Sequence, residues 1–265
     1  MSEERSMIVT QTKRIVIKIG SSILAKDGQS LSHPSLSGIV KEIAYSQKKN
    51  KETVIVSSGA IAAGMHHLGL TTKPETMSVL QACAAVGQPI LIQLYQKALS
   101  RSKLTGAQVL LDRVDLEHAD RRQNAKNTLI ELIERGIVPI INENDAVFVE
   151  EIRVGDNDNL ASMVACLIEA DLLILLTDQD GLYTTDPRKD RNAKKLDVIK
   201  QIDHSILSQA SDTLNTGSTG GMITKLAAAQ QAICHRIPTI IADGKDKKIL
   251  EKIYAGQNVG TLFIP

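Results

Sequence analysis

The sequence predicts an α/β fold with parallel strands, and three observations support it. Short apolar runs alternate along the chain with segments whose apolar residues recur at helical spacing. Residues 172–176 are all leucine or isoleucine, which is typical of a parallel strand buried on both faces. Polar or glycine-rich residues follow several of these runs, where open α/β sheets bind their ligands. With 265 residues, the chain is long enough for one large domain, and we expect residues 1–265 to form it.

The composition excludes several classes of function. The 31 basic and 30 acidic residues give a net charge of +1, and aromatic residues make up only 2% of the chain, so neither a basic surface nor base-stacking platforms for nucleic acid are expected. No apolar run reaches the roughly 18 residues of a membrane span, and the first residues lack the apolar core of a signal peptide. We expect a cytoplasmic protein that binds neither nucleic acid nor membranes. Cys83, Cys166 and Cys234 show no metal-binding spacing and are expected to be reduced core thiols.

The first strand is expected at residues 15–19, after a polar lead that closes at residues 13 and 14. Lys18 lies inside this otherwise apolar run, where a charge is costly unless it is paired or used. An edge strand with the lysine head in water is the alternative. The following Gly20-Ser-Ser segment offers backbone N–H donors, which suit an anion. Lys18 and this loop are therefore candidates to bind one phosphate.

Four helices and three strands are expected between residues 34 and 141. Helices are expected at 34–49, from Ala60, at 75–99 with a bend or break at Gly87 and Pro89, and at 124–135. Strands are expected at 53–56, 107–111 and 137–141, and a charged loop at 112–122. Ser57 and Ser58, which follow the second strand, are either hydrogen-bonding residues of a ligand loop or plain helix caps.

Acidic and amide residues gather in the stretch 142–158. Asn142, Glu143, Asn144 and Asp145 follow the strand at 137–141, and Asp156, Asn157 and Asp158 lie in a tight turn before a helix that begins near Leu160. Ordinary turns and helix caps would use the same residue types. Because clustered carboxylates repel phosphate, the stretch is expected to hold a cation, a substrate ammonium, or lysines that themselves meet a phosphate.

The last part of the chain carries a second candidate phosphate site. The strand at 172–176 ends in Thr177 and Asp178, and an exposed charged loop is expected at 187–195. The glycine-rich segment 217–225 ends in Lys225 and opens a helix, so backbone N–H groups and a lysine converge at a helix N-terminus. The residue order is not that of a Walker A loop, and a flexible linker is the alternative. Strands at 238–242 and 260–263, with a short helix near Ile249, complete the chain.

Six motifs, taken together and in this order, resemble the amino acid kinase family from about residue 13 to the end of the chain. They are Lys18-Ile-Gly-Ser-Ser, Ser57-Ser-Gly-Ala-Ile-Ala-Ala-Gly64, Ile141-Asn-Glu-Asn-Asp-Ala146, Gly155-Asp-Asn-Asp-Asn-Leu160, Leu176-Thr-Asp-Gln-Asp-Gly-Leu-Tyr183 and Gly220-Gly-Met-Ile-Thr-Lys225. The resemblance implies an eight-stranded, mainly parallel sheet between helices. It also implies an amino-acid-binding lobe at about 13–170 and a nucleotide-binding lobe at 171–265.

The resemblance is strongest to members that transfer the γ-phosphoryl group of ATP to the γ-carboxylate of L-glutamate, the first step of proline biosynthesis. ATP and Mg²⁺ are then the cofactors, with the metal held by phosphates and water rather than by protein ligands. The implied catalytic residues are Lys18, Asp158 and Lys225. The implied glutamate-binding residues are Ser58, Asn142, Asp145, Asp156 and Asn157. The implied nucleotide-binding residues are Lys18, Thr177, Asp178, Thr219, Gly220, Gly221, Met222, Ile223, Thr224 and Lys225.

Other properties of these relatives are expected with less support from the residues. Many of them continue into a C-terminal PUA domain, and this chain is expected to lack it because the sequence ends at Pro265. A homo-oligomer, either a dimer or a tetramer, and feedback inhibition by proline are the implied assembly and regulation. Two alternatives stay open. One is a family member that acts on acetylglutamate, a uridylate or a carbamate, and the other is a nucleotide-binding regulator without catalytic activity.

Overall fold

The computed structural model describes residues 3–26, 30–147, 157–187, 189–204, 206–207 and 221–265. Within them, eight strands form one sheet in the order β5-β6-β4-β1-β7-β9-β10-β8. The strands are β1 (Arg14–Ile19), β4 (Glu52–Ser57), β5 (Gly106–Leu110), β6 (Val138–Asn142), β7 (Leu172–Thr177), β8 (Val198–Ile199), β9 (Thr239–Asp243) and β10 (Thr261–Phe263). Neighbouring strands are parallel except β9 and β10, which are antiparallel. A small hairpin of β2 (Ala25–Lys26) and β3 (Ser30–Leu31) stands apart from this sheet.

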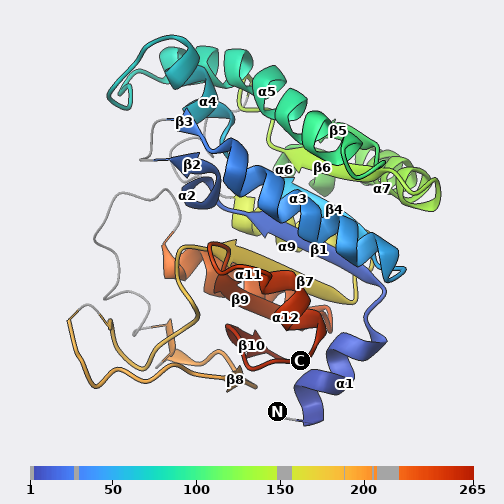
Figure 1. The fold of residues 1–265 in the computed structure, drawn as a ribbon, viewed down its shortest axis with the longest axis vertical. Coiled ribbons are helices and arrows are strands. Elements are labelled where there is room, and N and C mark those ends of the chain that lie inside the picture. The colour runs from blue at the N-terminus through green and yellow to red at the C-terminus, as the bar shows by residue number, and fades with distance from the viewer. Residues whose placement is uncertain (1–2, 27–29, 148–156, 188, 205, 208–220) are drawn as a thin grey trace.

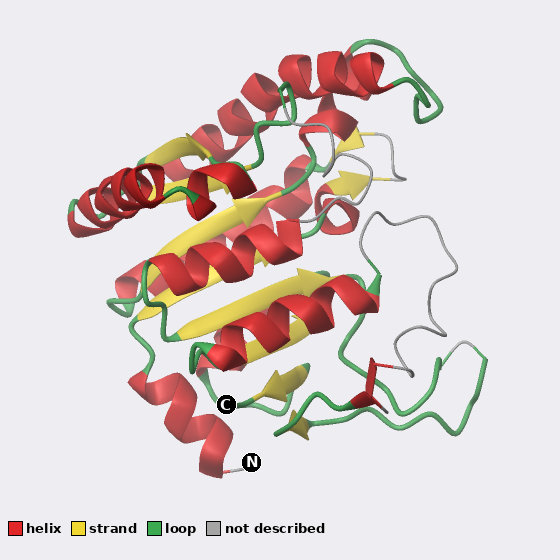
Figure 2. Cartoon of the chain, turned by 180° about the vertical axis from the view of Figure 1, so that it is seen from behind, coloured by secondary structure: helices red, strands yellow, loops and turns green. Residues whose placement is uncertain are grey.

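Helices cover both faces of the sheet, as predicted for a three-layer α/β fold (Figures 1 and 2). Ile15 and Ile17 of β1 pack in one apolar core with α3 (His33–Lys48), α5 (Met77–Ser100) and α12 (Ile249–Tyr254). Val16 points to the opposite face and packs with α7 (Ala119–Glu134), α9 (Asn157–Leu167) and α11 (Met222–Cys234). Since side chains alternate along a strand, Lys18 lies on the same face as Val16, toward α9 and α11. The remaining helices are α1 (Glu3–Gln11), α2 (Ser21–Leu24), α4 (Ala60–His67) and α6 (Arg113–Glu117).

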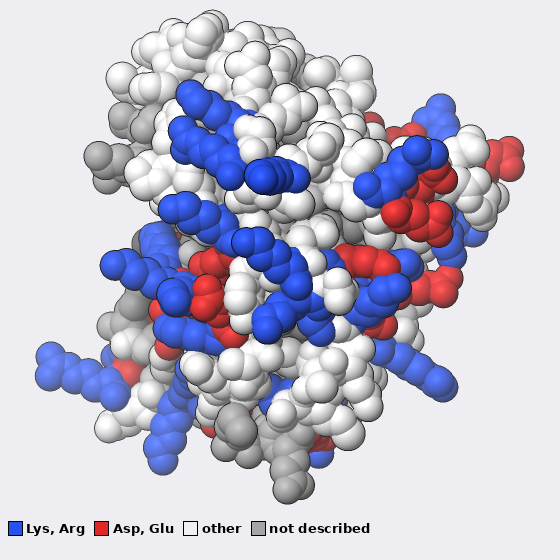
Figure 3. Space-filling view, turned by 45° about the vertical axis from the view of Figure 1, so that its right-hand side comes forward, with Lys and Arg blue, Asp and Glu red and all other residues white. Residues whose placement is uncertain are grey.

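The strand β1 lies inside the sheet, between β4 and β7. The alternative of an edge strand that leaves Lys18 in water is therefore wrong, and the side chain of Lys18 is 7% exposed. Figure 3 shows basic side chains grouped at the upper left of one face, and basic and acidic side chains side by side lower down and at the right. The mixed charges agree with the net charge of +1.

One predicted loop and the polar lead, to which no element was assigned, are helical. Residues 112–122 were expected to form a charged loop, but they contain α6 and the first turn of α7. The side chain of Asp112 accepts from the backbone of Asp115, and the backbone N–H of Asp112 donates to the Asp115 carboxylate, so a reciprocal cap stabilises this short helix. The polar lead is α1, which Arg5 fixes by donating to the carbonyls of Val259 and Asp197. These partners lie far away along the chain, so local periodicity does not reveal them.

The helix α5 runs without a break through Gly87 and Pro89, so of the two expected outcomes, a bend or a break, the break is wrong. Pro89 and the residue one turn before it, Ala85, are both exposed, and the carbonyl that loses its helical partner can therefore bond to water. In the described part of the chain, α5 is also the one helix that is long and apolar enough to cross a membrane. Core helices pass the same test, and α5 packs against α3 and α4.

The three cysteines are free thiols, but only one of them fits the expected core position. Cys83 is buried, Cys166 is half-buried and Cys234 is exposed. The expectation of a core thiol is therefore wrong for Cys234, which ends α11 at the surface.

Glycines allow α4 and α5 to approach closely. A Cβ at Gly87 would lie 1.8 Å from the carbonyl oxygen of Ala60, whereas a Cβ at Gly38, in α3, would meet no atom within 4 Å. We expect Gly87→Ala to destabilise the protein by about 3 kcal/mol because backbone must move. We expect Gly38→Ala to stabilise it by about 0.5–1 kcal/mol because alanine is the better helix former. Equilibrium denaturation of both variants checks this, and a small effect of equal sign at both positions would contradict the packing.

Candidate active site

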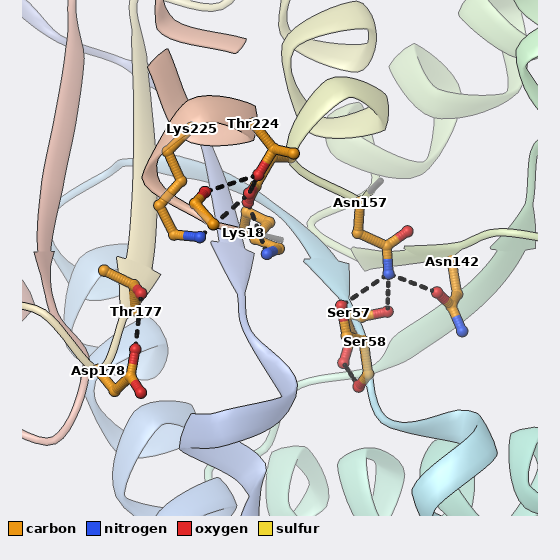
Figure 4. Close-up of polar contacts among 11 residues, drawn as sticks. Lys18, Ser57, Ser58, Asn142, Asn157, Thr177, Asp178, Thr224 and Lys225 are labelled. Carbon is orange, nitrogen blue, oxygen red and sulfur yellow. Dashed lines mark hydrogen bonds and ion pairs between the residues drawn. The ribbon is translucent and has the colours of Figure 1, made fainter. Parts of the chain in front are cut away.

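A buried carboxylate joins two lysines at the carboxyl end of β1 (Figure 4). Lys18 Nζ lies 2.6 Å from Oδ1 of Asp158, and Lys225 Nζ lies 3.3 Å from Oδ2. Asp158 is fully buried, and both lysine side chains are less than one tenth exposed. The hydroxyl of Thr224 lies 2.8 Å from the same Oδ2. Residues far apart in the sequence thus form one charged cluster with a net charge of +1.

Local structure explains why these side chains meet. Lys18 points to the sheet face that carries α9 and α11, since it alternates with the residues packed on the other face. Asp158 lies in the first turn of α9, where the helix dipole favours a negative charge. Lys225 and Thr224 lie in the first turn of α11, next to α9. Each helix therefore begins at the cluster, and its first-turn residues point into it.

The two lysines keep Asp158 ionised. Burial alone would raise the pKa of this carboxyl group, but Lys18 and Lys225 outweigh burial and lower it from 3.8 to about 2. This contribution to stability is complete above the unfolded-state pKa and is lost as the pH falls through about 2. Burial lowers the pKa of Lys225, while Asp158 raises it. Asp158 therefore helps Lys225 to stay charged in a site that would otherwise favour the neutral amine.

A chain of amide side chains lies beside this cluster. Nδ2 of Asn157 donates to Ser58 Oγ at 2.8 Å and to Asn142 Oδ1 at 2.9 Å. Asn142 Nδ2 in turn donates to Oε1 of Gln88 at 2.8 Å. Among the described residues, Nε2 of Gln88 and Oδ1 of Asn157 are buried without a hydrogen-bond partner. Such a group costs about 1–3 kcal/mol, so two of them in residues that both bond to Asn142 need an explanation.

A cavity of about 410 Å³ lies on the other side of the cluster, at the carboxyl ends of β7 and β9. Its walls include residues 178–183, Met222 and Asp243. Thr261 Oγ1 accepts from the backbone N–H of Leu182 and so fixes one wall. A second cavity, of about 450 Å³, lies at the amino ends of the strands, where Thr12 precedes β1 and Asp171 precedes β7. Ligands of open α/β sheets bind at the carboxyl ends of strands, so we consider the first cavity part of the site.

The structure brings together many of the residues that the sequence singles out. Lys18, Asp158 and Lys225 form the charged cluster, and Asn142 and Asn157 belong to the amide chain, which Ser58 contacts. Thr177 and Asp178 contact each other at the end of β7, and Gly221, Met222, Ile223 and Thr224 lie at the start of α11. Asp145 follows β6 in a turn and is half-buried. Asp156, Thr219 and Gly220 lie outside the described residues.

The sequence did not single out Gln88, which continues the amide chain onto α5. Its neighbours in the sequence are apolar or small. The only feature that could have indicated a functional role is that Gln88 is a polar residue on a mostly apolar helix.

Comparisons with known proteins agree with this geometry. Residues 13–243 match the amino acid kinase family. The chain is 43% identical over 261 residues to a glutamate 5-kinase of Geobacter metallireducens, which covers 98% of this chain and 70% of the relative. It is 44% identical over 257 residues to a glutamate 5-kinase of Cupriavidus taiwanensis, which covers 97% of this chain and 69% of the relative.

A solved structure shares the fold. The UMP kinase from Ureaplasma parvum superposes on 96% of this chain and on its own full length with a TM-score of 0.65, at 17% sequence identity. The fold class predicted from the sequence is thereby confirmed, including the eight-stranded sheet. The chain belongs to the amino acid kinase family and, within it, groups with the glutamate 5-kinases.

Proposed function

We propose that this chain transfers the γ-phosphoryl group of ATP to the γ-carboxylate of L-glutamate and so begins proline biosynthesis. One observation carries the proposal: two buried lysines share one buried carboxylate where β1, α9 and α11 converge. Phosphoryl transfer depends on positioning and on neutralising charge, which two lysines fixed by a common anchor provide. The relatives named above carry the name of this activity.

In this mechanism, Lys18 and Lys225 contact the transferring phosphoryl group, and Asp158 holds both ammonium groups in place. An oxygen of the γ-carboxylate forms a bond to the γ-phosphorus, and the bond from that phosphorus to the bridging oxygen of ADP breaks. The products are L-glutamyl 5-phosphate and ADP. The nucleophile is already ionised at neutral pH, so the step needs no general base. A neighbourhood rich in lysine rather than histidine fits this requirement.

We place the substrate at the amide chain. Ser58, Asn142 and Asn157 supply hydrogen bonds, and Asn157 Oδ1 is a buried acceptor without a partner in the described part of the chain, which suits an ammonium donor. Asp145, half-buried just after β6, and Asp156 supply negative charge for the α-ammonium. A free amine is favoured over an acylated one because an amide cannot compensate buried negative charge.

We place ATP at the cavity beside β7, with Thr177, Asp178 and residues 219–225 around its phosphates. Residues 13–170 then form the amino-acid-binding lobe and residues 171–265 the nucleotide-binding lobe. Mg²⁺ would accompany ATP and neutralise part of the phosphate charge, held by phosphate oxygens and water. Asp178 offers one carboxylate at the end of β7, near enough to Lys225 to raise its pKa, which fits an ion that needs few protein ligands.

Three further properties stay predictions. We propose that the protein works in the cytoplasm, that it forms a homo-oligomer, either a dimer or a tetramer, and that proline inhibits it. Size-exclusion chromatography with light scattering, and assays with added proline, test the last two.

The substrate prediction is that free L-glutamate is phosphorylated and N-acetylglutamate is not. The acidic residues Asp145 and Asp156 favour an ammonium group, and an N-acetyl group removes that charge. The purified protein would be incubated with ATP, Mg²⁺, hydroxylamine and each acid, and the hydroxamate formed by trapping the acyl phosphate would be measured. Equal hydroxamate formation from the two acids would overturn the assignment.

A further inference from the structure

We infer that Gln88 is a substrate-binding residue, and that its side-chain N–H groups bind the α-carboxylate of glutamate. The inference rests on the proposed function and adds a residue that determines which amino acid is accepted. It follows from the direction of the hydrogen bonds in the amide chain. The chain starts at a backbone carbonyl, whose role is fixed because a carbonyl oxygen can only accept.

The carbonyl of Ser57 fixes the orientation of each amide in turn. It lies 3.2 Å from Nδ2 of Asn157, so the nitrogen of Asn157 must face it. That nitrogen also donates to Asn142 Oδ1, which turns the Asn142 nitrogen toward Oε1 of Gln88. The Gln88 amide must then point its nitrogen away from Asn142. The two N–H groups of the Gln88 side chain therefore lie at the end of the amide chain.

In the part of the chain that the structure describes, these donors are buried without an acceptor. Gln88 is 9% exposed, and its Nε2 has no hydrogen-bond partner among the described residues. A buried donor of this kind needs an acceptor, and a bound substrate can supply one. A carboxylate is the strongest candidate because it only accepts and carries a charge.

The first turn of α4 favours an anion in the same region. Gly59, the N-cap of α4, provides no side-chain cap, so first-turn N–H groups remain available. Gly87 packs directly against this turn, since a Cβ there would lie 1.8 Å from the Ala60 carbonyl oxygen. Gln88 is therefore fixed beside the start of α4, and Ser58, which contacts the amide chain, precedes that start by two residues.

The length of glutamate fits this assignment. Lys18 lies on β1, Ser58 follows β4 and Asn142 ends β6, and these three strands are adjacent in that order. Strands are spaced about 4.8 Å apart, so the end of β6 lies roughly 10 Å from that of β1. The two carboxyl carbons of extended glutamate are roughly 5 Å apart. With the γ-carboxylate near Lys18, the α-carboxylate extends toward the carboxyl ends of β4 and β6. The side chains of the amide chain lie there.

The test compares L-glutamate with 4-aminobutyrate, which keeps the ammonium and the reacting carboxylate but lacks the α-carboxylate. We expect Gln88→Met to lower kcat/KM for glutamate about 30-fold, mainly through KM, because one hydrogen bond to a charged group is lost. For 4-aminobutyrate, kcat/KM should change by less than about 2-fold, because this substrate has no α-carboxylate to accept from the lost N–H groups. Where its turnover is too slow, its inhibition constant against glutamate would be measured instead. The control Gln93→Met changes an exposed glutamine of the same helix. It should change kcat/KM neither for glutamate nor for 4-aminobutyrate.

A second variant keeps the hydrogen bond from Asn142. Gln88→Glu retains an acceptor for Asn142 but places a carboxylate against that of glutamate, so the activity with glutamate should fall further. L-isoglutamine, whose α-carboxamide can donate to the new carboxylate, should be less affected, so the preference for glutamate over L-isoglutamine should fall at least about 30-fold.

Different failures have different meanings. Equal losses for glutamate and 4-aminobutyrate in Gln88→Met, or no loss for either, would overturn the role of Gln88 while leaving the proposed reaction intact. An unchanged preference for glutamate over L-isoglutamine in Gln88→Glu would overturn it independently. If the wild-type protein phosphorylates no glutamate at all, the proposed function itself fails.

Discussion

Lys225→Met is expected to lower kcat about 100-fold and to leave KM for glutamate nearly unchanged. In the proposed mechanism, the substitution removes a charged donor to the transferring phosphoryl group, and such a contact contributes about 3 kcal/mol to the transition state. Asp158 keeps its 2.6 Å ion pair with Lys18, so the buried carboxylate is not left without a cation. Initial rates of hydroxamate formation at varied glutamate and saturating ATP measure both constants.

The control for this variant is Lys41→Met, which changes an exposed lysine of α3 in the same way. It should retain wild-type rates. Circular dichroism and a thermal melt would confirm that Lys225→Met is folded at the assay temperature. A folded variant with wild-type turnover would show that Lys225 has no role in the chemistry and would leave the cluster as a structural ion network.

The central layer of the fold could be predicted because its information is local. The run at 172–176 has no polar residue, and the structure buries it on both faces as β7. Lys18 could be recognised as unusual because a charge inside an apolar run is costly wherever the strand lies. The sequence alone did not decide whether β1 was an edge strand. That depends on the order of strands, which arises from contacts between distant segments.

The errors have the same origin. Arg5 is almost fully buried, but the carbonyls that bind it belong to residues 192 and 254 positions away, so its segment appeared to be a polar lead. Gln88 resembles any surface glutamine until Asn142, 54 positions away, is placed beside it. The cap between Asp112 and Asp115 is local and could have been recognised from the sequence, because two aspartates three residues apart are a helix-start pattern.

The site was predicted by two routes of unequal strength. Lys18, the stretch 142–158 and the segment ending at Lys225 were each recognisable as ligand-binding candidates from residue types at the ends of apolar runs. Their assembly around Asp158 came from the family resemblance, because no spacing in the sequence specifies which of several acids meets which lysine. In the structure, Lys18 Nζ and Lys225 Nζ approach different oxygens of that one carboxylate.

Asp158→Asn and Asp145→Asn are expected to fail in different ways. An asparagine at 158 has one acceptor oxygen and cannot hold two ammonium groups, and its amide nitrogen repels the second lysine. The phosphoryl group is then misplaced, and kcat should fall about 100-fold with a smaller change in KM for glutamate. Asparagine at 145 removes charge from the neighbourhood of the substrate ammonium but keeps a polar side chain, so KM for glutamate should rise with a smaller loss of kcat.

The pH dependence provides a second readout for Asp158→Asn. Asp158 raises the pKa of Lys225 against the lowering effect of burial, so its removal should lower that pKa further. A lysine must be protonated to hold phosphate, and the alkaline fall of kcat/KM for ATP should therefore move to lower pH in Asp158→Asn and stay in place in Asp145→Asn. Both variants would be checked for folding by circular dichroism before kinetics at saturating Mg²⁺. If Asp158→Asn altered only the affinity for glutamate while Asp145→Asn abolished turnover, the assignment of one acid to the lysines and the other to the substrate would be reversed.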